Sequence, residues 1–116
     1  MGFFRLYSGQ DQQSHLDELN LPFAPGQFAQ QTPLQPVTGM TFTRVSSRPV
    51  ADWHNAPRRQ YVVTLAGAVE IGLGDGSVHR FGPGDVVLAE DLTGKGHTTR
   101  AVGEEPWLVM IVPLKD

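Results

Sequence analysis

Cysteine is absent from this chain of 116 residues, so any bound metal must take its ligands from histidine, carboxylate or amide side chains. Long apolar runs are missing too, because the most apolar stretch, Trp107 to Val112, is far shorter than the roughly 20 residues that a membrane-spanning helix needs. The start, Met1 to Tyr7, has an arginine after two aromatic residues and lacks the apolar region of a signal peptide. We therefore expect a cytoplasmic protein that does not enter a membrane.

Basic residues are few and scattered. Nine Lys and Arg stand against 12 Asp and Glu, which gives a net charge of -3. Nucleic-acid-binding domains concentrate positive charge on one face or along one helix. The scatter argues against a nucleic-acid partner and favours a small molecule.

Glycine and proline, 13 and nine residues, interrupt the chain at intervals of about eight to twelve positions, a spacing typical of β-sandwiches and barrels. The runs between them are rich in Val, Thr, Phe, Leu and Ile. The sequence thus predicts one all-β domain over residues 1–116, with strands at Phe3–Tyr7, Thr38–Val45, Gln60–Ala66, Ala68–Leu73, Ser77–Phe81, Asp85–Ala89, His97–Val102 and Trp107–Pro113.

Residues 1–36 are expected to form an N-terminal strand and arm, and residues 37–114 the core of the domain. Asp11–Leu19 can form a short helix or equally an extended segment. Leu21–Pro36 contains four prolines and four glutamines, which block a regular element and predict an ordered surface loop.

Two turns are marked by glycine. Gly74-Asp75-Gly76 predicts a β-hairpin, because Asp-Gly supplies the positive φ angles of a type I′ turn. The corner Phe81-Gly82-Pro83-Gly84-Asp85 ends the second strand of that hairpin, since proline cannot donate to a ladder.

The segment Tyr61–Leu65 is apolar on both faces, as expected of a strand that is covered on two sides. One cover is the interior of the domain. The other is the N-terminal arm or a second subunit, and from this we predict a homodimer.

Histidine and glutamine side chains can meet in the interior. Residues two apart in a strand share a face, so an extended segment from His54 would point His54 and Gln60 inward, and antiparallel pairing would bring His97 across from them. Two imidazoles and an amide oxygen form a plausible three-ligand site for a divalent metal.

The order of these residues resembles the cupin superfamily. Its first motif is similar to His-x-His, three or four residues, Glu, six residues and Gly; this chain has His54-x-Ala56, three residues, Gln60, six residues and Gly67. Its second motif, Gly, five residues and Pro-x-Gly-x-x-His, is matched by Gly84 and His97, with Glu90 in the place of proline and a longer approach to the histidine.

The stretch Trp53 to Val62, together with Glu90 to His97, is also similar to a group of small single-domain bacterial cupins. The resemblance covers Thr38 to Leu114 best. It implies a double-stranded β-helix, or jelly-roll, barrel with an N-terminal arm. It also implies a degenerate metal site, because Ala56 removes one ligand and Gln60 replaces a carboxylate. We expect at most one weakly held divalent metal, which would be iron, manganese, nickel or zinc.

Each candidate residue has a structural alternative. His54 and His97 are metal ligands or hydrogen-bonded structural histidines, and Gln60 is a ligand or a partner of a histidine or organic ligand. Asp91 is a general base, a group that orients His97, or a residue that holds the following loop through backbone amides. For the substrate pocket the candidates are Trp53, Met40, Phe42, Arg58 and Met110, of which the apolar residues can equally belong to the core or rim, and Arg58 is chosen over Arg59 by strand parity.

Two functions remain open at this stage. One is a metal-dependent enzyme, of the dioxygenase or isomerase type, that acts on a small polar or carboxylate-bearing molecule. The alternative is a metal-free module that binds or senses a sugar or organic acid. A metal-free isomerase or lyase using His97 and Asp91 as acid and base is a third, with only the general chemistry of those groups behind it.

Overall fold

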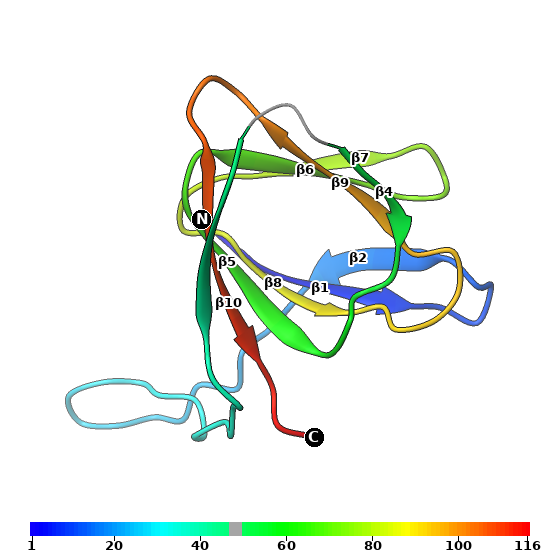
Figure 1. The fold of residues 1–116 in the computed structure, drawn as a ribbon. Helices are drawn as coiled ribbons and strands as arrows, with labels where there is room; N and C mark the ends of the chain where they lie inside the picture. The colour runs from blue at the N-terminus through cyan, green and yellow to red at the C-terminus, as the bar shows by residue number, and fades with distance from the viewer. Residues whose placement is uncertain (47–49) are drawn as a thin grey trace.

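The protein folds into two β-sheets packed as a sandwich, as a computed structural model of residues 1–46 and 50–116 shows (Figure 1). Its ten strands are β1 (Phe3–Ser8), β2 (Ser14–Glu18), β3 (Thr41–Val45), β4 (Val50–His54), β5 (Gln60–Ala66), β6 (Ala68–Gly72), β7 (Val78–Phe81), β8 (Val86–Glu90), β9 (His97–Val102) and β10 (Trp107–Pro113).

The strands divide into a sheet of six and a sheet of four. The larger sheet has the order β2-β1-β8-β5-β10-β3, and the smaller sheet has the order β4-β9-β6-β7. Between residues 41 and 113 the strands pair as nested antiparallel partners: β3 with β10, β4 with β9, β5 with β8 and β6 with β7. The N-terminal hairpin β1–β2 then extends the larger sheet, because β1 lies parallel to β8.

The all-β prediction is therefore confirmed, and the described residues form a two-sheet sandwich in which no closed barrel is found. The segment expected to be helical or extended contains strand β2. Strand β4 was not predicted as a separate element. The described residues also contain no helix long and apolar enough to cross a membrane.

The predicted hairpin joins β6 to β7, but its turn is not of type I′. That type needs a positive φ at both central residues, whereas Gly76 has a φ of 88° and Asp75 does not have a positive φ. Instead, the Gly76 N–H donates to Leu73 O at 3.1 Å, and Asp75 accepts hydrogen bonds from the backbone and hydroxyl of Ser77. The aspartate thus stabilises the turn through its side chain, as an Asx turn does.

The core lies between the sheets and is made of alternate residues from both. Its buried members are Leu6, Val69, Ile71, Leu73, Phe81, Val87, Ala101, Trp107 and Val109. Thr64 is the one hydroxyl group among the largest fully buried side chains, and it accepts a hydrogen bond from the Trp107 indole N–H at 3.0 Å. This bond satisfies a polar group that would otherwise destabilise the apolar interior.

Ion pairs on the outer side of the larger sheet connect four segments of the chain. Glu90, at the end of β8, binds Arg5 of β1 and the Arg59 Nε atom at 2.8 Å, and Arg59 also binds Asp116 at 2.6 Å. Burial by itself raises the pKa of the Glu90 carboxyl, but the hydrogen bonds and charges of Arg5 and Arg59 outweigh it and hold this pKa below its ordinary value of 4.5.

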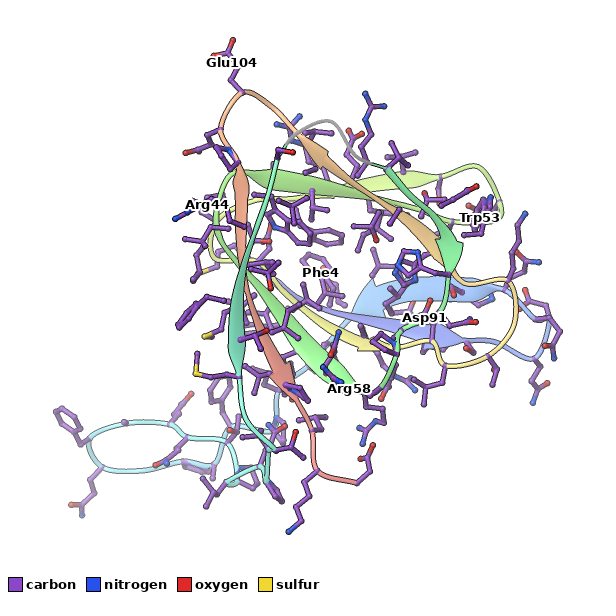
Figure 2. The ribbon with its side chains drawn as sticks, viewed as in Figure 1. Phe4, Arg44, Trp53, Arg58, Asp91 and Glu104 are labelled. Carbon is purple, nitrogen blue, oxygen red and sulfur yellow. The ribbon has the colours of Figure 1, made fainter. Side chains whose placement is uncertain are left out.

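Because its pKa is lower in the folded state, Glu90 stabilises the fold above the pKa of the unfolded chain, and this contribution is lost as pH falls through the folded pKa. We expect Glu90→Gln to lower the free energy of unfolding at pH 7 by about 1 kcal/mol. Between pH 7 and pH 3 the difference from wild type should shrink, as measured by urea unfolding. Glu104→Gln is the matched control, because Glu104 points into solvent (Figure 2). A constant difference at all pH values would contradict this assignment.

Candidate functional site

A cavity of about 140 Å³ lies between the sheets. Most of its wall is apolar, and polar side chains enter it at few positions. The lining residues are Leu6, Ala56, Pro57, Gln60, Val62, Thr64, Val69, Ile71, Phe81, Val87, Ala89, His97, Thr99, Trp107 and Ile111. This composition, with mostly apolar walls and a few polar groups, is typical of ligand-binding cavities.

Strand parity explains how β5 contributes to the wall. Gln60, Val62 and Thr64 face the cavity, and the residues between them face outward. Gln60 is buried, and within the part of the chain that the structure describes its Oε1 atom has no hydrogen-bond partner. An unpaired buried acceptor is unfavourable unless a donor or a cation meets it.

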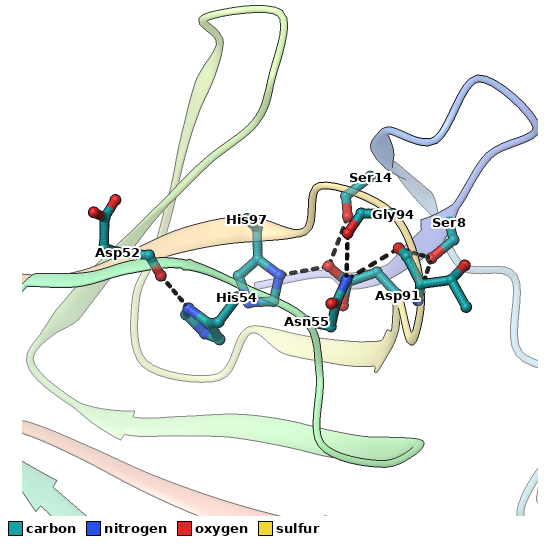
Figure 3. Close-up of polar contacts among 9 residues, drawn as sticks. Ser8, Ser14, Asp52, His54, Asn55, Asp91, Gly94 and His97 are labelled. Atoms are coloured by element: carbon teal, nitrogen blue, oxygen red, sulfur yellow. Dashed lines mark hydrogen bonds and ion pairs between the residues drawn. The ribbon is translucent and has the colours of Figure 1, made fainter.

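His54 and His97 face each other across the pairing of β4 with β9. They are register partners at the ends of their strands, and their ring centroids are 4.5 Å apart at an angle of 57° (Figure 3). A register shift between Ala51 and His54 marks an irregularity in β4 just before the pair. His97 is buried and lines the cavity, whereas His54 is half-buried and stands beside it outside the cavity wall.

A fully buried carboxylate, Asp91, orients His97. Its Oδ2 atom accepts hydrogen bonds from the His97 Nδ1 at 2.5 Å and from the Ser14 hydroxyl at 2.7 Å (Figure 3). Its backbone carbonyl accepts the Ala56 N–H at 3.2 Å. Asp91 therefore connects β2, β9 and the segment after β4, and holds the His97 proton on Nδ1.

His54 is held in the same tautomer by a different acceptor. Its Nδ1 atom lies 2.6 Å from the backbone carbonyl of Asp52, and a carbonyl can only accept, so Nδ1 carries the hydrogen. In the neutral form of each ring, Nε2 then has a free lone pair. Histidines that bind metals have this arrangement, with one nitrogen donating to a carbonyl or carboxylate and the other on the metal.

The loop between β8 and β9 sets the positions of both histidines. The Asn55 amide donates to the carbonyls of Thr93 and Gly94, the Lys95 N–H donates to Gln12 O at 2.9 Å, and Ser8 exchanges hydrogen bonds with Thr93. The Lys95 ammonium also lies 4.3 Å from the centroid of the Trp53 ring. The site thus depends on contacts between segments that are far apart in the sequence.

The predicted site residues fall into two groups. His54, Gln60, His97 and Asp91 gather at one end of the sandwich, and of the three roles proposed for Asp91 its side-chain contacts match the orientation of His97. The pocket candidates Trp53, Met40, Phe42, Arg58 and Met110 are not among the residues that line the cavity. Phe42 and Met110 pair with each other on the outer face, because Thr43 and Val109 occupy the inner positions of their strands.

Ser14 was not recognised from the sequence as part of the site. It has no informative spacing to Asp91, which lies 77 residues away, and the two meet only because β1 pairs with both β2 and β8. The sequence analysis also did not assign Thr64, Thr99, Phe81 and Trp107 to the cavity wall, because they come together only through long-range strand pairing. No local pattern marks them.

In the described ranges, 1–46 and 50–116, no group of three or more His, Asp and Glu side chains is arranged to hold a metal ion. A metal would therefore need Gln60 in addition to the two histidines. No protein-family model matches the chain, and no match was found among the curated proteins.

Gly96 sets the distance between the loop and His54. Its φ is 80°, and a Cβ at this position would lie 2.1 Å from the backbone carbonyl oxygen of His54. We expect Gly96→Ala to destabilise the protein by about 2–3 kcal/mol. Gly76→Ala is the matched control, because Gly76 has a φ of 88° and nothing within 4 Å of an added Cβ. Chemical denaturation of both variants measures the difference, and equal losses would show that the close contact with His54 is unimportant.

Proposed function

We propose that strands β3 to β10 form a jelly roll of the cupin kind and that the protein binds a small molecule between its sheets. The four nested antiparallel pairs support the fold assignment, because a jelly roll is an eight-stranded fold of two sheets with Greek-key connections. The N-terminal hairpin is an addition to one sheet. Its Ser14 reaches the site through Asp91.

The cavity limits the size and character of the ligand. Its volume of about 140 Å³ is close to that of an engineered cavity of about 150 Å³ that takes up benzene. Its walls are mostly aliphatic and aromatic, and the polar residues of the lining are Gln60, Thr64, His97 and Thr99. The ligand class that fits is one ring or a short chain with a single polar or carboxylate head.

One observation indicates what binds the polar head group of the ligand. Among the described residues, three lone pairs have no assigned donor: those on Nε2 of His97 and Oε1 of Gln60, which belong to residues of the cavity lining, and on Nε2 of His54, which stands beside the cavity. A set of acceptors needs a cation or a donor. We infer that a divalent metal, iron, manganese, nickel or zinc, binds these three atoms and anchors a carboxylate-bearing ligand.

These three ligands should bind a metal less tightly than the ligands of a typical cupin site. Ala56 supplies no ligand, and the Gln60 amide compensates less of the cation's charge than a carboxylate would. Ala56 nevertheless lines the cavity, so the missing imidazole leaves space there that the ligand can occupy. The proposal is therefore a weakly held metal beside an enlarged apolar cavity.

A bound metal would supply Lewis-acid polarisation of the ligand's oxygen atoms. The chain's own residues do the rest: Asp91 fixes the orientation of His97, and the apolar walls exclude water from the ligand. Asp91 is fully buried and outside the cavity wall, so in an enzyme of the dioxygenase or isomerase type it would be a positioning residue.

A metal-free binding module is the second candidate, and the apolar wall beside the unpaired Gln60 oxygen favours it. Without a cation this end of the cavity presents acceptors. It would then prefer a ligand that donates a hydrogen bond, such as a hydroxyl compound, over a carboxylate.

Replacing Gln60 tests the metal site. In untagged protein we expect Gln60→Glu to bind metal more tightly by on the order of tenfold, because a carboxylate adds a negative charge to the set. His97→Ala should lose binding, and His79→Ala, on β7, should leave it unchanged. Equilibrium dialysis with elemental analysis against each of the four metals measures this. If no metal is taken up stoichiometrically, or if Gln60→Glu matches wild type, the metal proposal is wrong.

Thermal unfolding with benzoate and with phenol distinguishes the metal-dependent site from the metal-free module. A ligand that binds only the folded state raises the melting temperature. With a metal anchor, benzoate stabilises the protein only when metal is present, and His97→Ala removes the effect. In a metal-free module, phenol stabilises the protein without metal, and Gln60→Leu removes the effect. If neither probe acts at millimolar concentration, binding in this cavity is contradicted.

A further inference from the structure

The protein uses only the oxygen of the Thr64 hydroxyl, on the inner face of β5. Thr64 is 2% exposed, and its Oγ1 atom accepts the Trp107 indole N–H at 3.0 Å. Because an indole can only donate, this bond takes a lone pair of Oγ1 and does not use the hydroxyl hydrogen. Among residues 1–46 and 50–116, no acceptor for that hydrogen is found. A buried donor without an acceptor is unfavourable, so this hydroxyl is available to a ligand.

Thr64 and Gln60 are the two polar residues that β5 contributes to the cavity wall, and apolar Val62 lies between them. A strand rises by about 3.4 Å per residue, so four residues separate the Cα atoms of Gln60 and Thr64 by about 13 Å. Along β5, the cavity therefore has a polar side chain at each end of an apolar wall.

The two ends differ in their hydrogen-bonding character. At the Gln60 end, the proposed site presents the acceptors Gln60 Oε1 and His97 Nε2. At the other end Thr64 offers a donor, and the Trp107 N–H is already bound to Thr64. Thr99, the remaining polar residue of the lining, lies only two residues from His97 on β9 and is half-buried. A ligand that fills the cavity thus meets acceptors, or a metal that they hold, at one end and a hydroxyl donor at the other.

We propose that the Thr64 hydroxyl is a second anchor, which donates a hydrogen bond to an acceptor at the end of the ligand opposite its head group. This inference rests on the proposed function, because it needs a ligand whose head group binds beside Gln60 and His97. The ligand class becomes narrower: an elongated ring compound or short chain with a carboxylate or hydroxyl head at one end and a carbonyl or ether oxygen at the other.

The second anchor acts mainly on specificity. A site with a buried donor rejects a ligand of the same shape that cannot accept a hydrogen bond, because that ligand leaves the donor unpaired. The Trp107 N–H also restricts the rotation of the hydroxyl, since it occupies one lone pair of Oγ1. The donor is therefore oriented before the ligand binds, which lowers the cost of ordering it.

Matched para-substituted probes test the anchor. 4-Cyanobenzoate and 4-ethynylbenzoate have nearly the same shape, but only the nitrile accepts a hydrogen bond, and 4-cyanophenol and 4-ethynylphenol are the equivalent pair with a hydroxyl head. Titration calorimetry of the benzoates with metal and of the phenols without metal covers both head groups. In the pair whose head group binds, we expect the cyano compound to have a Kd about tenfold lower than its ethynyl partner.

Thr64→Val keeps the shape of the side chain and removes the donor, so it should bind the two compounds of a pair equally, and Thr64→Ser should restore the preference. Thr64→Val also leaves the Trp107 N–H without its acceptor, which can unfold the protein. The change is therefore repeated in Trp107→Phe, where the single variant should keep the cyano preference and the double variant should lose it. Thr98→Val is the matched control, because Thr98 is a half-buried β9 threonine outside the cavity lining.

The outcomes separate this anchor from the proposed function. If benzoate or phenol stabilises the protein while the cyano and ethynyl compounds bind equally, or neither binds, the ligand site stands and the Thr64 anchor is refuted. A cyano preference that Thr99→Val removes and Thr64→Val retains refutes it too, because the donor would then be on β9. If benzoate and phenol also fail to stabilise the protein, binding in the cavity is contradicted, and the anchor with it.

Discussion

A buried carboxylate holds the candidate site together. Asp91 has no exposed surface, and an ionised group in that position is tolerated only when hydrogen bonds and partners compensate for the lost water. Ser14 and His97 supply hydrogen bonds to its Oδ2 atom from two separate segments, and the Ala56 N–H donates to the backbone carbonyl of Asp91. A change that moves Ser14 or His97 therefore removes a hydrogen-bond partner from a buried carboxylate, so the N-terminal hairpin and β9 are constrained to keep their positions relative to Asp91.

The same constraint gives the proposed site its chemistry. A hydrogen bond to Asp91 decides which nitrogen of His97 is free, and the Asp52 carbonyl does the same for His54. Both rings then offer Nε2 without any rearrangement. The geometry is set before a ligand arrives, and preorganisation of this kind lowers the cost of binding.

Because alternation and turn residues are local signals, the sequence predicted the described strands except β4 and β2, and the segment that contains β2 was left open between helix and extended chain. It also predicted the grouping of His54, Gln60, Asp91 and His97. The pocket walls were predicted less well. Met40, Phe42 and Met110 were assigned to the pocket only because their side chains are apolar. When a strand has apolar residues on both faces, hydrophobicity does not show which face points to the cavity. The face is decided by register, which places Met110 opposite Phe42 and Val109 beside the core.

Long-range pairing accounts for what no local pattern could supply. Ser14 reaches Asp91 because β1 is hydrogen-bonded to β2 on one side and to β8 on the other. The type of the β6–β7 turn also depended on more than its Asp-Gly pair, since the Asp75 side chain bonds to Ser77 and leaves only Gly76 with a positive φ.

Strand β5 presents different side chains on its two faces. In β5, Gln60, Val62 and Thr64 face the cavity, and Tyr61, Val63 and Leu65 face outward. A single strand thus contributes both to the wall of the cavity and to the outer face of the larger sheet. Because β5 is hydrogen-bonded to β8 and β10 along most of its length, it cannot slide by one residue without exchanging these two sets of side chains. The side chains required on the inner face therefore also determine which side chains of β5 point outward.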